Sequence, residues 1–267
     1  MIDIDGRPLL EGQPSRLKDK VALVTGGGTG IGKAAALRFA SERARVVLVG
    51  RRESEIAAVA GAIQAEGGSA LPIVADVSRA EDVEVLFRRA IEHFGRVDVA
   101  FNNAGIEGAF GPAHLMSEAD FDRVIATNLK GVWLTLKLEI AAMLEHGDGG
   151  AIVNTSSWLA KGALAGSSAY SASKGALDAM VRAIALDVAA DGIRINNVNP
   201  GIIDTPMMRR FVDDETAKPW AAFTPMKRLG TPEDIGDVAV WLCTHEARFI
   251  TGQSILVDGG YTIAGMR

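Results

Sequence analysis

The chain has 267 residues, of which 48% are hydrophobic and 23% charged, and its formal net charge is -5. This is the composition of a folded protein with a sizeable core, and it argues against a disordered chain. The negative charge, without a basic stripe, argues against nucleic-acid binding, and no apolar run is long enough for a membrane-spanning helix.

Short β-branched apolar runs alternate with helical stretches along most of the chain. The expected strands cover residues 21–25, 45–49, 70–74, 97–101, 151–155 and 194–199, and the expected helices cover 31–43, 53–66, 81–94, 118–145 and 169–190. Continuous apolar strands that alternate with helices predict a parallel sheet covered on both faces. Right-handed crossovers make this a doubly wound α/β fold of the Rossmann type. Because no linker or repeat divides the chain, we expect a single domain at residues 17–267 behind a tail at residues 1–16.

The turn between the first strand and the first helix is rich in glycine, since residues 25–32 read TGGGTGIG. Glycines let the turn tighten and let backbone N–H groups approach a pyrophosphate, and the following helix offers its N-terminus to an anion. A glycine turn without a ligand is the alternative, which the position directly between strand and helix disfavours. The residues of this turn that we expect to bind a dinucleotide are Gly26, Thr29, Gly30, Ile31 and Gly32.

Two arginines follow the second strand, where an NAD-binding chain would carry an acidic residue for the adenosine ribose. Arg51 and Arg52 could hold a 2′-phosphate, because guanidinium groups pair with phosphate through two hydrogen bonds. We therefore expect NADP in preference to NAD. The alternative is that both arginines are solvated, or that one of them pairs with Glu53.

Two further strand ends carry candidate binding residues. Asp76, followed by Val77, ends the third strand and could accept a hydrogen bond from an adenine amino group. It could equally cap the next helix, although Ser78 is better placed for that role. The glycine-rich stretch at residues 106–113 follows the fourth strand, at the sheet edge where such folds place their ligands.

Ser157, Tyr170 and Lys174 stand in the spacing Ser-x12-Tyr-x3-Lys. A Tyr and a Lys four residues apart on a helix share one face, so we expect the ammonium to lower the phenol pKa from about 10 towards working pH. A phenol tuned in this way is a general acid/base for a hydroxyl or carbonyl oxygen, which Ser157 could also hydrogen-bond. The alternative is a chance Tyr-x3-Lys in an amphipathic helix, so the interpretation depends on the other motifs.

The segment from Asp204 to Gly230 breaks the alternation of strands and helices. It carries three prolines and several large apolar residues, among them Met207, Phe211 and Trp220. Long segments of this kind often cover a site, so we expect a substrate lid at about residues 204–230. A packed surface excursion is the alternative.

Cysteine and histidine usage points to no redox or metal site. Cys243 is the only cysteine, which excludes a disulfide within the chain, and its apolar surroundings predict a buried, inert thiol. The four histidines lack paired ligand spacing, so no metal is expected. The first ten residues lack the regions of a signal peptide, and we expect a cytoplasmic protein.

Together these motifs resemble the short-chain dehydrogenase/reductase family. The resemblance runs from about residue 17 to 261 and includes NNAG at 102–105, Asn128 in TNLKG, NPGIIDT at 199–205 and the ending from Arg228 to Gly260. It implies a doubly wound sheet of about seven parallel strands, a nicotinamide cofactor and commonly a homotetramer. Thr29 departs from the basic residue that many NADP-using relatives carry, so Arg51 is the main basis for expecting NADP.

The resemblance also implies roles for individual residues. The stretch 102–105, including Asn103, Ala104 and Gly105, would line the adenosine and nicotinamide side of the cleft. Ile203 and Thr205 would hold the carboxamide, while Pro200 and Gly201 would pack beside the ring. Lys174 would hold the ribose hydroxyls next to Tyr170, and Asn128 would hold a water that links Lys174 to solvent.

These roles predict hydride transfer between the cofactor and a ketone or secondary alcohol. The substrate pocket is expected to be formed by Ser157, Trp158, Leu159, Tyr170, Met207 and Phe211. With a largely apolar wall of few charges, we expect a neutral, fairly hydrophobic small molecule as the substrate. The alternatives are an NAD-dependent alcohol dehydrogenase of the same family and a non-catalytic regulator that binds NADP. A third alternative is an epimerase or dehydratase on a related fold, which the ending VDGGYT and the short substrate region disfavour.

The helices at 118–145 and 169–190 carry more apolar and small residues than one buried face requires. Large apolar patches normally mark contacts between chains. With the family precedent, which also uses the strand at 255–257, this predicts a homotetramer, or failing that a dimer.

Overall fold

The computed structural model describes residues 15–263, so the predicted tail at residues 1–16 lies, apart from Ser15 and Arg16, outside the described residues. The described residues form one seven-stranded parallel sheet in the order β3-β2-β1-β4-β5-β6-β7. The strands are β1 (Val21–Thr25), β2 (Arg45–Gly50), β3 (Ser69–Val74), β4 (Val99–Asn102), β5 (Gly150–Thr155), β6 (Ile193–Pro200) and β7 (Ser254–Val257). The helices are α1 (Gly30–Ser41), α2 (Glu53–Ala65), α3 (Ala80–Phe94), α4 (Glu118–Ile125), α5 (Gly131–His146), α6 (Ser168–Val188), α7 (Asp214–Phe223) and α8 (Pro232–Cys243). The expected doubly wound α/β fold is therefore confirmed.

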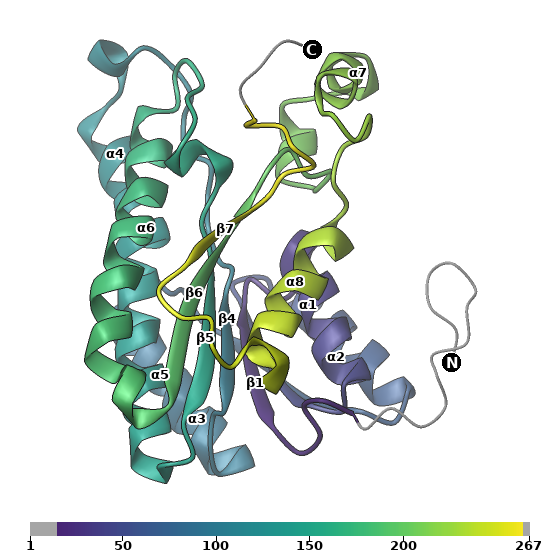
Figure 1. The fold of residues 1–267 in the computed structure, drawn as a ribbon, viewed down its shortest axis with the longest axis vertical. Helices are drawn as coiled ribbons and strands as arrows, with labels where there is room; N and C mark the ends of the chain where they lie inside the picture. The colour runs from purple at the N-terminus through teal and green to yellow at the C-terminus, as the bar shows by residue number, and fades with distance from the viewer. Residues whose placement is uncertain (1–14, 264–267) are drawn as a thin grey trace.

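Helices cover both faces of the sheet (Figure 1). On one face α1, α2 and α8 bury apolar side chains such as Phe39 and Ile56, and on the other α3, α5 and α6 bury Leu136 and Val181. Burial on both faces explains why the strands are continuous apolar runs rather than alternating ones. The strand order reverses between β1 and β4, and such a switch point opens a crevice at the carboxyl edge of the sheet. Within residues 15–263, no helix is both long and apolar enough to span a membrane.

The helix expected at residues 118–145 is divided. α4 runs into a π-helical turn, η2 (Ala126–Lys130), before α5 begins, and the backbone stays right-handed helical at both junctions. A hydrophobic pattern does not reveal such a turn, because it widens the helix without breaking its apolar face. π-turns often lie at functional sites, and this one carries Asn128.

Two smaller expectations about element ends were wrong. The fourth strand begins at Val99 rather than at residue 97, and the carboxylate of Asp98 accepts a hydrogen bond from the Val21 N–H at 2.9 Å. The cap of α3 is Arg79, because Asp76 and Ser78 bond to each other in the preceding turn.

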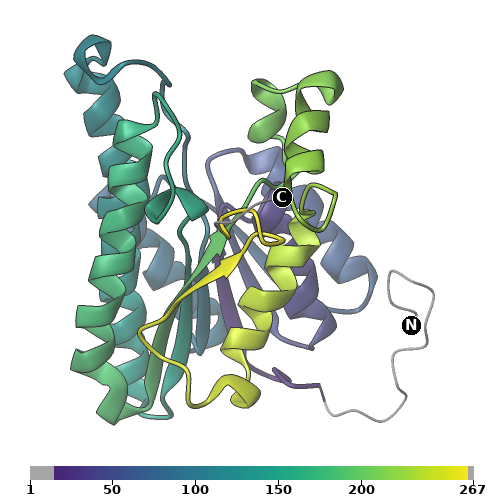
Figure 2. The same ribbon diagram turned by 45° about the horizontal axis from the view of Figure 1, so that its top comes forward.

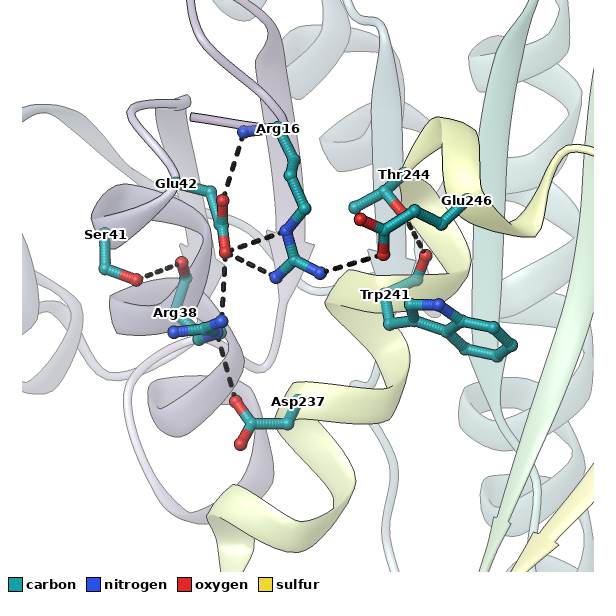
Figure 3. Close-up of polar contacts among 8 residues, drawn as sticks. All are labelled: Arg16, Arg38, Ser41, Glu42, Asp237, Trp241, Thr244 and Glu246. Atoms are coloured by element: carbon teal, nitrogen blue, oxygen red, sulfur yellow. Dashed lines mark hydrogen bonds and ion pairs between the residues drawn. The ribbon is translucent and has the colours of Figure 1, made fainter. Parts of the chain in front are cut away.

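An ion cluster fastens the first described residues to the domain (Figure 3). Arg16 pairs with Glu42, which follows α1, and with Glu246 in the short helix η6 (His245–Ala247) at 3.2 Å. Glu42 also accepts a hydrogen bond from Arg38 of α1 at 2.9 Å, and Arg38 reaches Asp237 of α8 at 3.2 Å. The cluster therefore joins three segments that are far apart in the sequence.

Candidate active site

A cleft of about 910 Å³ opens at the carboxyl edge of the sheet. In Figure 2 this edge, which carries α4 and α7, is turned forward. The cleft is lined from the glycine turn after β1 and the ends of β2 and β3 across to α6 and the segment after β6. Its volume lies in the upper range of small-molecule and cofactor sites. Nearly all the predicted site residues line it, and only Gly32, Asn102 and Asn128 do not.

The glycine turn explains why Gly32 is not in the lining. Gly26 and Gly30 adopt φ values of +66° and +51°, which favour glycine. A Cβ added at Gly32 would lie 2.1 Å from the carbonyl oxygen of Gly26. Gly32 thus serves the close packing of α1 on the turn, while Gly26, Thr29, Gly30 and Ile31 face the cleft.

Charged residues surround the end of the cleft beside β2. Arg51 lies 3.8 Å from a carboxylate oxygen of Asp76, and Arg52 pairs with Glu55 at 2.7 Å. Arg52 also lies 3.4 Å from the hydroxyl of Thr29. Burial raises the pKa of Asp76, but hydrogen bonds from Ser78 and the charge of Arg51 outweigh it and hold this pKa below its usual range. Both arginine side chains are about two-thirds exposed, at 64% and 63%, so they can turn towards an anion in the cleft.

Ser157, Tyr170 and Lys174 meet on the opposite wall. Ser157 follows β5, and its hydroxyl accepts a hydrogen bond from the Leu159 N–H at 3.1 Å and bonds to Tyr170. Lys174 is 3% exposed, donates to the carbonyl of Thr155 at 2.6 Å and lies 5.6 Å from the centre of the Tyr170 ring. The sequence prediction that these side chains come together is met by this geometry.

The expected lowering of the Tyr170 pKa was wrong for this structure. Burial raises the pKa of Tyr170 to about 12, Ser157 opposes this, and the charge of Glu107 adds to it. Burial also lowers the pKa of Lys174 to about 8, which the charge of Asp178 opposes. The sequence spacing correctly predicted that Tyr170 and Lys174 are neighbours. It did not reveal that their burial in the wall disfavours both the tyrosinate and the ammonium form.

Asn128 is fully buried behind this wall. Its amide oxygen accepts from the Ile106 N–H at 2.8 Å, and its amide nitrogen donates to the Ile106 carbonyl at 2.8 Å and to Ser173 at 3.3 Å. Asn128 therefore fixes the loop after β4. Asn102, which the resemblance placed on the cleft wall, points into the core instead, with 1% exposure.

The substrate end of the cleft is more charged than predicted. Trp158 and Leu159 of the short helix η3 (Trp158–Ala160) form one side, and Met207 and Phe211 form the other. The remaining lining includes Glu107, Arg123 and Arg210. Glu107 accepts two hydrogen bonds from Arg210, each 2.9 Å long, and this pair crosses from the loop after β4 to η5 (Met208–Arg210). Sequence reasoning missed the pair because its members stand 103 residues apart.

Residues 26–262 match the family model described as enoyl-(acyl carrier protein) reductase. The chain is 39% identical over 249 residues to the A-factor type gamma-butyrolactone 1′-reductase (1S-forming) of Streptomyces virginiae, covering 92% of this chain and 97% of that protein. It is 38% identical over 248 residues to the cyclohexanol dehydrogenase of Acinetobacter sp. (strain SE19), covering 93% and 97%. The crystal structure of 3-ketoacyl-(acyl-carrier-protein) reductase from Brucella melitensis complexed with NADH matches with a TM-score of 0.87 and 36% identity, covering 92% of this chain and 100% of that one.

The family model covers the glycine turn from Gly26, the wall formed by Ser157, Tyr170 and Lys174, and the segment after β6. These matches confirm the family that the sequence motifs indicated. The chain belongs to the short-chain dehydrogenase/reductase family and is an NAD(P)-dependent oxidoreductase that acts on alcohols and ketones.

Proposed function

We propose that the protein transfers hydride between NADP(H) and a neutral, fairly hydrophobic ketone or secondary alcohol, with Tyr170 as the general acid/base. The observation that carries this proposal is the convergence of Ser157, Tyr170 and Lys174 on one wall of a cleft whose far end holds a glycine turn and two arginines. Fold alone would not carry it, because one fold serves many reactions.

The residues of the cleft fit a dinucleotide phosphate. The turn at Gly26–Ile31 opens α1, whose N-terminus favours a pyrophosphate, and Arg51 with Arg52 suits a 2′-phosphate. The remaining cofactor contacts that we propose are Asp76, Val77, Asn103, Ala104 and Gly105 on one side and Tyr170, Lys174, Pro200, Gly201, Ile203 and Thr205 on the other. The nicotinamide supplies or accepts the hydride when the cofactor is bound.

The protein's own part in the reaction is to orient the oxygen and to move its proton. Burial raises the pKa of Tyr170 to about 12, so Tyr170 holds its proton at neutral pH but is a weaker acid. Its donation to the carbonyl oxygen during reduction would therefore depend on the ammonium of Lys174 beside it. The Ser157 hydroxyl bonds to Tyr170 and would orient the same oxygen. Lys174 in its charged form would stabilise the tyrosinate that remains, and Asn128 would support the proton path behind Lys174.

The pocket wall supports a neutral substrate despite its charged residues. Glu107 pairs with Arg210, and Arg123 pairs with Asp120 at 2.7 Å, so each charge that faces the pocket has a partner of opposite sign. Trp158, Leu159, Met207 and Phe211 supply apolar surface around the oxygen that Ser157 and Tyr170 would hold. A cyclic ketone such as cyclohexanone is therefore a suitable first probe.

An NAD-dependent alcohol dehydrogenase is the second candidate, and two observations favour it. Arg51 and Arg52 each have a carboxylate partner, Asp76 and Glu55, which would have to yield to a 2′-phosphate. The Brucella melitensis relative was crystallised with NADH. Measuring kcat/KM for NADPH and NADH with the same ketone decides between the two candidates.

The proposed acid/base role is tested with Tyr170→Phe, which removes one hydroxyl and leaves the ring. We expect a loss of at least about 10²-fold in kcat with cyclohexanone or the best ketone of a panel. NADPH affinity, measured by fluorescence, should change little. Near wild-type turnover in this variant would exclude the mechanism, whereas NADPH binding by the wild type without turnover of any ketone or alcohol would favour a regulator.

A further inference from the structure

Three buried asparagines form a ladder across the middle of the sheet. Asn102 on β4 stands in register with Asn154 on β5, which stands in register with Asn197 on β6. The amide of Asn102 donates to Asn154 at 3.0 Å, and the amide of Asn154 donates to Asn197 at 3.0 Å. All three are at most 1% exposed. Buried amides are costly unless they are bonded, so the ladder has one favoured arrangement.

A carboxyl group on a helix terminates each end of this asparagine ladder. Asn102 donates to Glu139 of α5 at 2.9 Å, and Asn197 donates to Asp178 of α6 at 3.2 Å. Asp178 stands one turn after Lys174 on the same helix. The ladder thus connects the core to the helix that carries Tyr170 and Lys174.

Asn199 connects Asp178 to Ser157 on the wall of the cleft. Its amide nitrogen lies 3.0 Å and 3.3 Å from the two Asp178 carboxylate oxygens and donates to the backbone carbonyl of Ser157 at 3.0 Å. A carboxylate only accepts hydrogen bonds, so Asp178 forces Asn199 to turn its NH₂ group, and not its oxygen, to this side. In the orientation that Asp178 imposes, the Asn199 amide nitrogen can also donate to the Ser157 carbonyl.

Two hydrogen bonds fix the position of Ser157. Its carbonyl is held by Asn199, and its hydroxyl oxygen accepts from the Leu159 N–H at 3.1 Å. With the backbone and the hydroxyl oxygen both fixed, the hydroxyl proton is left to point towards the oxygen of Tyr170 or of a substrate. A small displacement of the Ser157 hydroxyl would lower the reaction rate strongly.

We propose that Asp178 is a positioning residue for the reaction, which acts through Asn199 on the carbonyl of Ser157 and so aims the Ser157 hydroxyl. This inference rests on the proposed function of Ser157 and Tyr170. Asp178 also lies close enough to Lys174 to favour its charged form. The titratable groups that face the Tyr170–Lys174 pair are Asp178 on α6 and Glu107 in the loop after β4.

The test compares Asn199→Ala and Asp178→Asn with Glu139→Gln, a control that changes the far end of the same ladder. For Asn199→Ala and Asp178→Asn we expect kcat for the reduction of cyclohexanone, or of the best panel ketone, to fall roughly tenfold to hundredfold. The Kd for NADPH should stay within about twofold, since neither residue lines the cleft. Glu139→Gln should keep the wild-type kcat, because Ser157 retains its partner.

The pH profile separates positioning from a loss of packing. Without the Asp178 charge the pKa of Lys174 falls further, so the alkaline limb of kcat should move to lower pH in Asp178→Asn. It should not move in Asn199→Ala, which keeps the carboxylate. Where Asn199→Ala does not fold, Asn199→Ser replaces it, and the same loss of kcat is expected.

Two results would overturn the inference: a wild-type kcat in the folded Asn199 variant, or an equal loss in Glu139→Gln. Tyr170→Phe is assayed in parallel. If Tyr170→Phe stays active, the proposed function fails first. If it is inactive while the Asp178 and Asn199 variants match the wild type, only the positioning role fails.

Discussion

We expect the two arginines after β2 to determine whether the cleft prefers NADP or NAD. Arg51 and Arg52 hold carboxylate partners and remain mostly exposed, so the ion pairs are weak and can be exchanged for a phosphate. A guanidinium gains two charge-assisted hydrogen bonds from a phosphate, and NAD lacks that group.

Arg51→Gln should therefore shift the preference from NADP towards NAD by one to a few kcal/mol, about the value of charge-assisted hydrogen bonds. The ratio of kcat/KM for NADPH and NADH measures the shift. Arg79→Gln is the matched control, because Arg79 pairs with Asp82 at 3.4 Å and does not line the cleft. A wild-type enzyme that already prefers NADH at equal concentrations would refute the expectation before any variant is made.

Glu139 gives the folded protein a pH dependence of its own. Burial raises its pKa from 4.5 to about 8, so the folded state binds this proton more tightly than the unfolded state does. The contribution to stability is complete below the unfolded pKa and is lost as pH rises through the folded pKa. Between about pH 5 and about pH 8, the free energy of unfolding should fall on the order of a few kcal/mol more for the wild type than for Glu139→Gln. Denaturant titrations at both pH values measure this, and parallel pH dependences would contradict it.

Residue types and spacings predicted most of the residues that line the cleft, but not the pKa shifts of the buried groups. Ser157, Tyr170 and Lys174 were found because helical spacing and strand ends place them together. Glu139 was not, since a glutamate in a long helix normally faces solvent. Its hydrogen-bond partner, Asn102 on β4, lies 37 residues away in the sequence, and no local pattern contains such a contact.

At the scale of elements, the segment after β6 holds the least predictable part of the site. Its proline and aromatic content suggested a lid, and α7 with η5 does lie along the cleft. Two contacts join this segment to the loop after β4: the Glu107–Arg210 pair and an edge contact between Phe110 and Phe211, whose ring centres are 6.2 Å apart. Contacts over such sequence distances follow from topology, so they could not be read from the segment itself.

Arg210→Gln should loosen the attachment of the segment after β6 to the loop after β4. We expect KM for the ketone to rise severalfold and limited proteolysis within residues 204–230 to become faster, because the partly buried Glu107 carboxylate loses its partner. Lys218→Gln removes an exposed pair of the same segment and should change neither quantity. Equal effects of the two substitutions would argue against a specific clamp.

On the scale of the whole molecule, several large apolar side chains remain on the surface. Leu186 of α6 is 84% exposed, and Trp133 and Leu144 of α5 and Leu256 of β7 are also exposed. They belong to the two helices and the strand for which the sequence predicted contacts between chains. Their exposure supports an assembly built on those elements.

We therefore expect a homotetramer, with a dimer as the alternative, in light scattering at micromolar concentration. Leu186→Asp should lower the measured mass, because a carboxylate cannot be buried between chains without a partner. Val85→Asp on α3, also exposed, is the control and should leave the mass unchanged. A wild-type mass of 28.1 kDa would show a monomer and refute both assemblies.

The ion cluster around Arg16 has a consequence for the opposite end of α1. This helix begins at the glycine turn after β1 and ends beside Glu42, where Arg16, Arg38, Asp237 and Glu246 hold it in place. Because α1 is a single helix of 12 residues, we expect its anchored end to govern the tilt of the end where the cofactor would bind. Added salt screens the partly exposed charges of this cluster. We therefore expect salt to lower the affinity for the dinucleotide through the tilt of α1, in addition to competing directly at the phosphate sites.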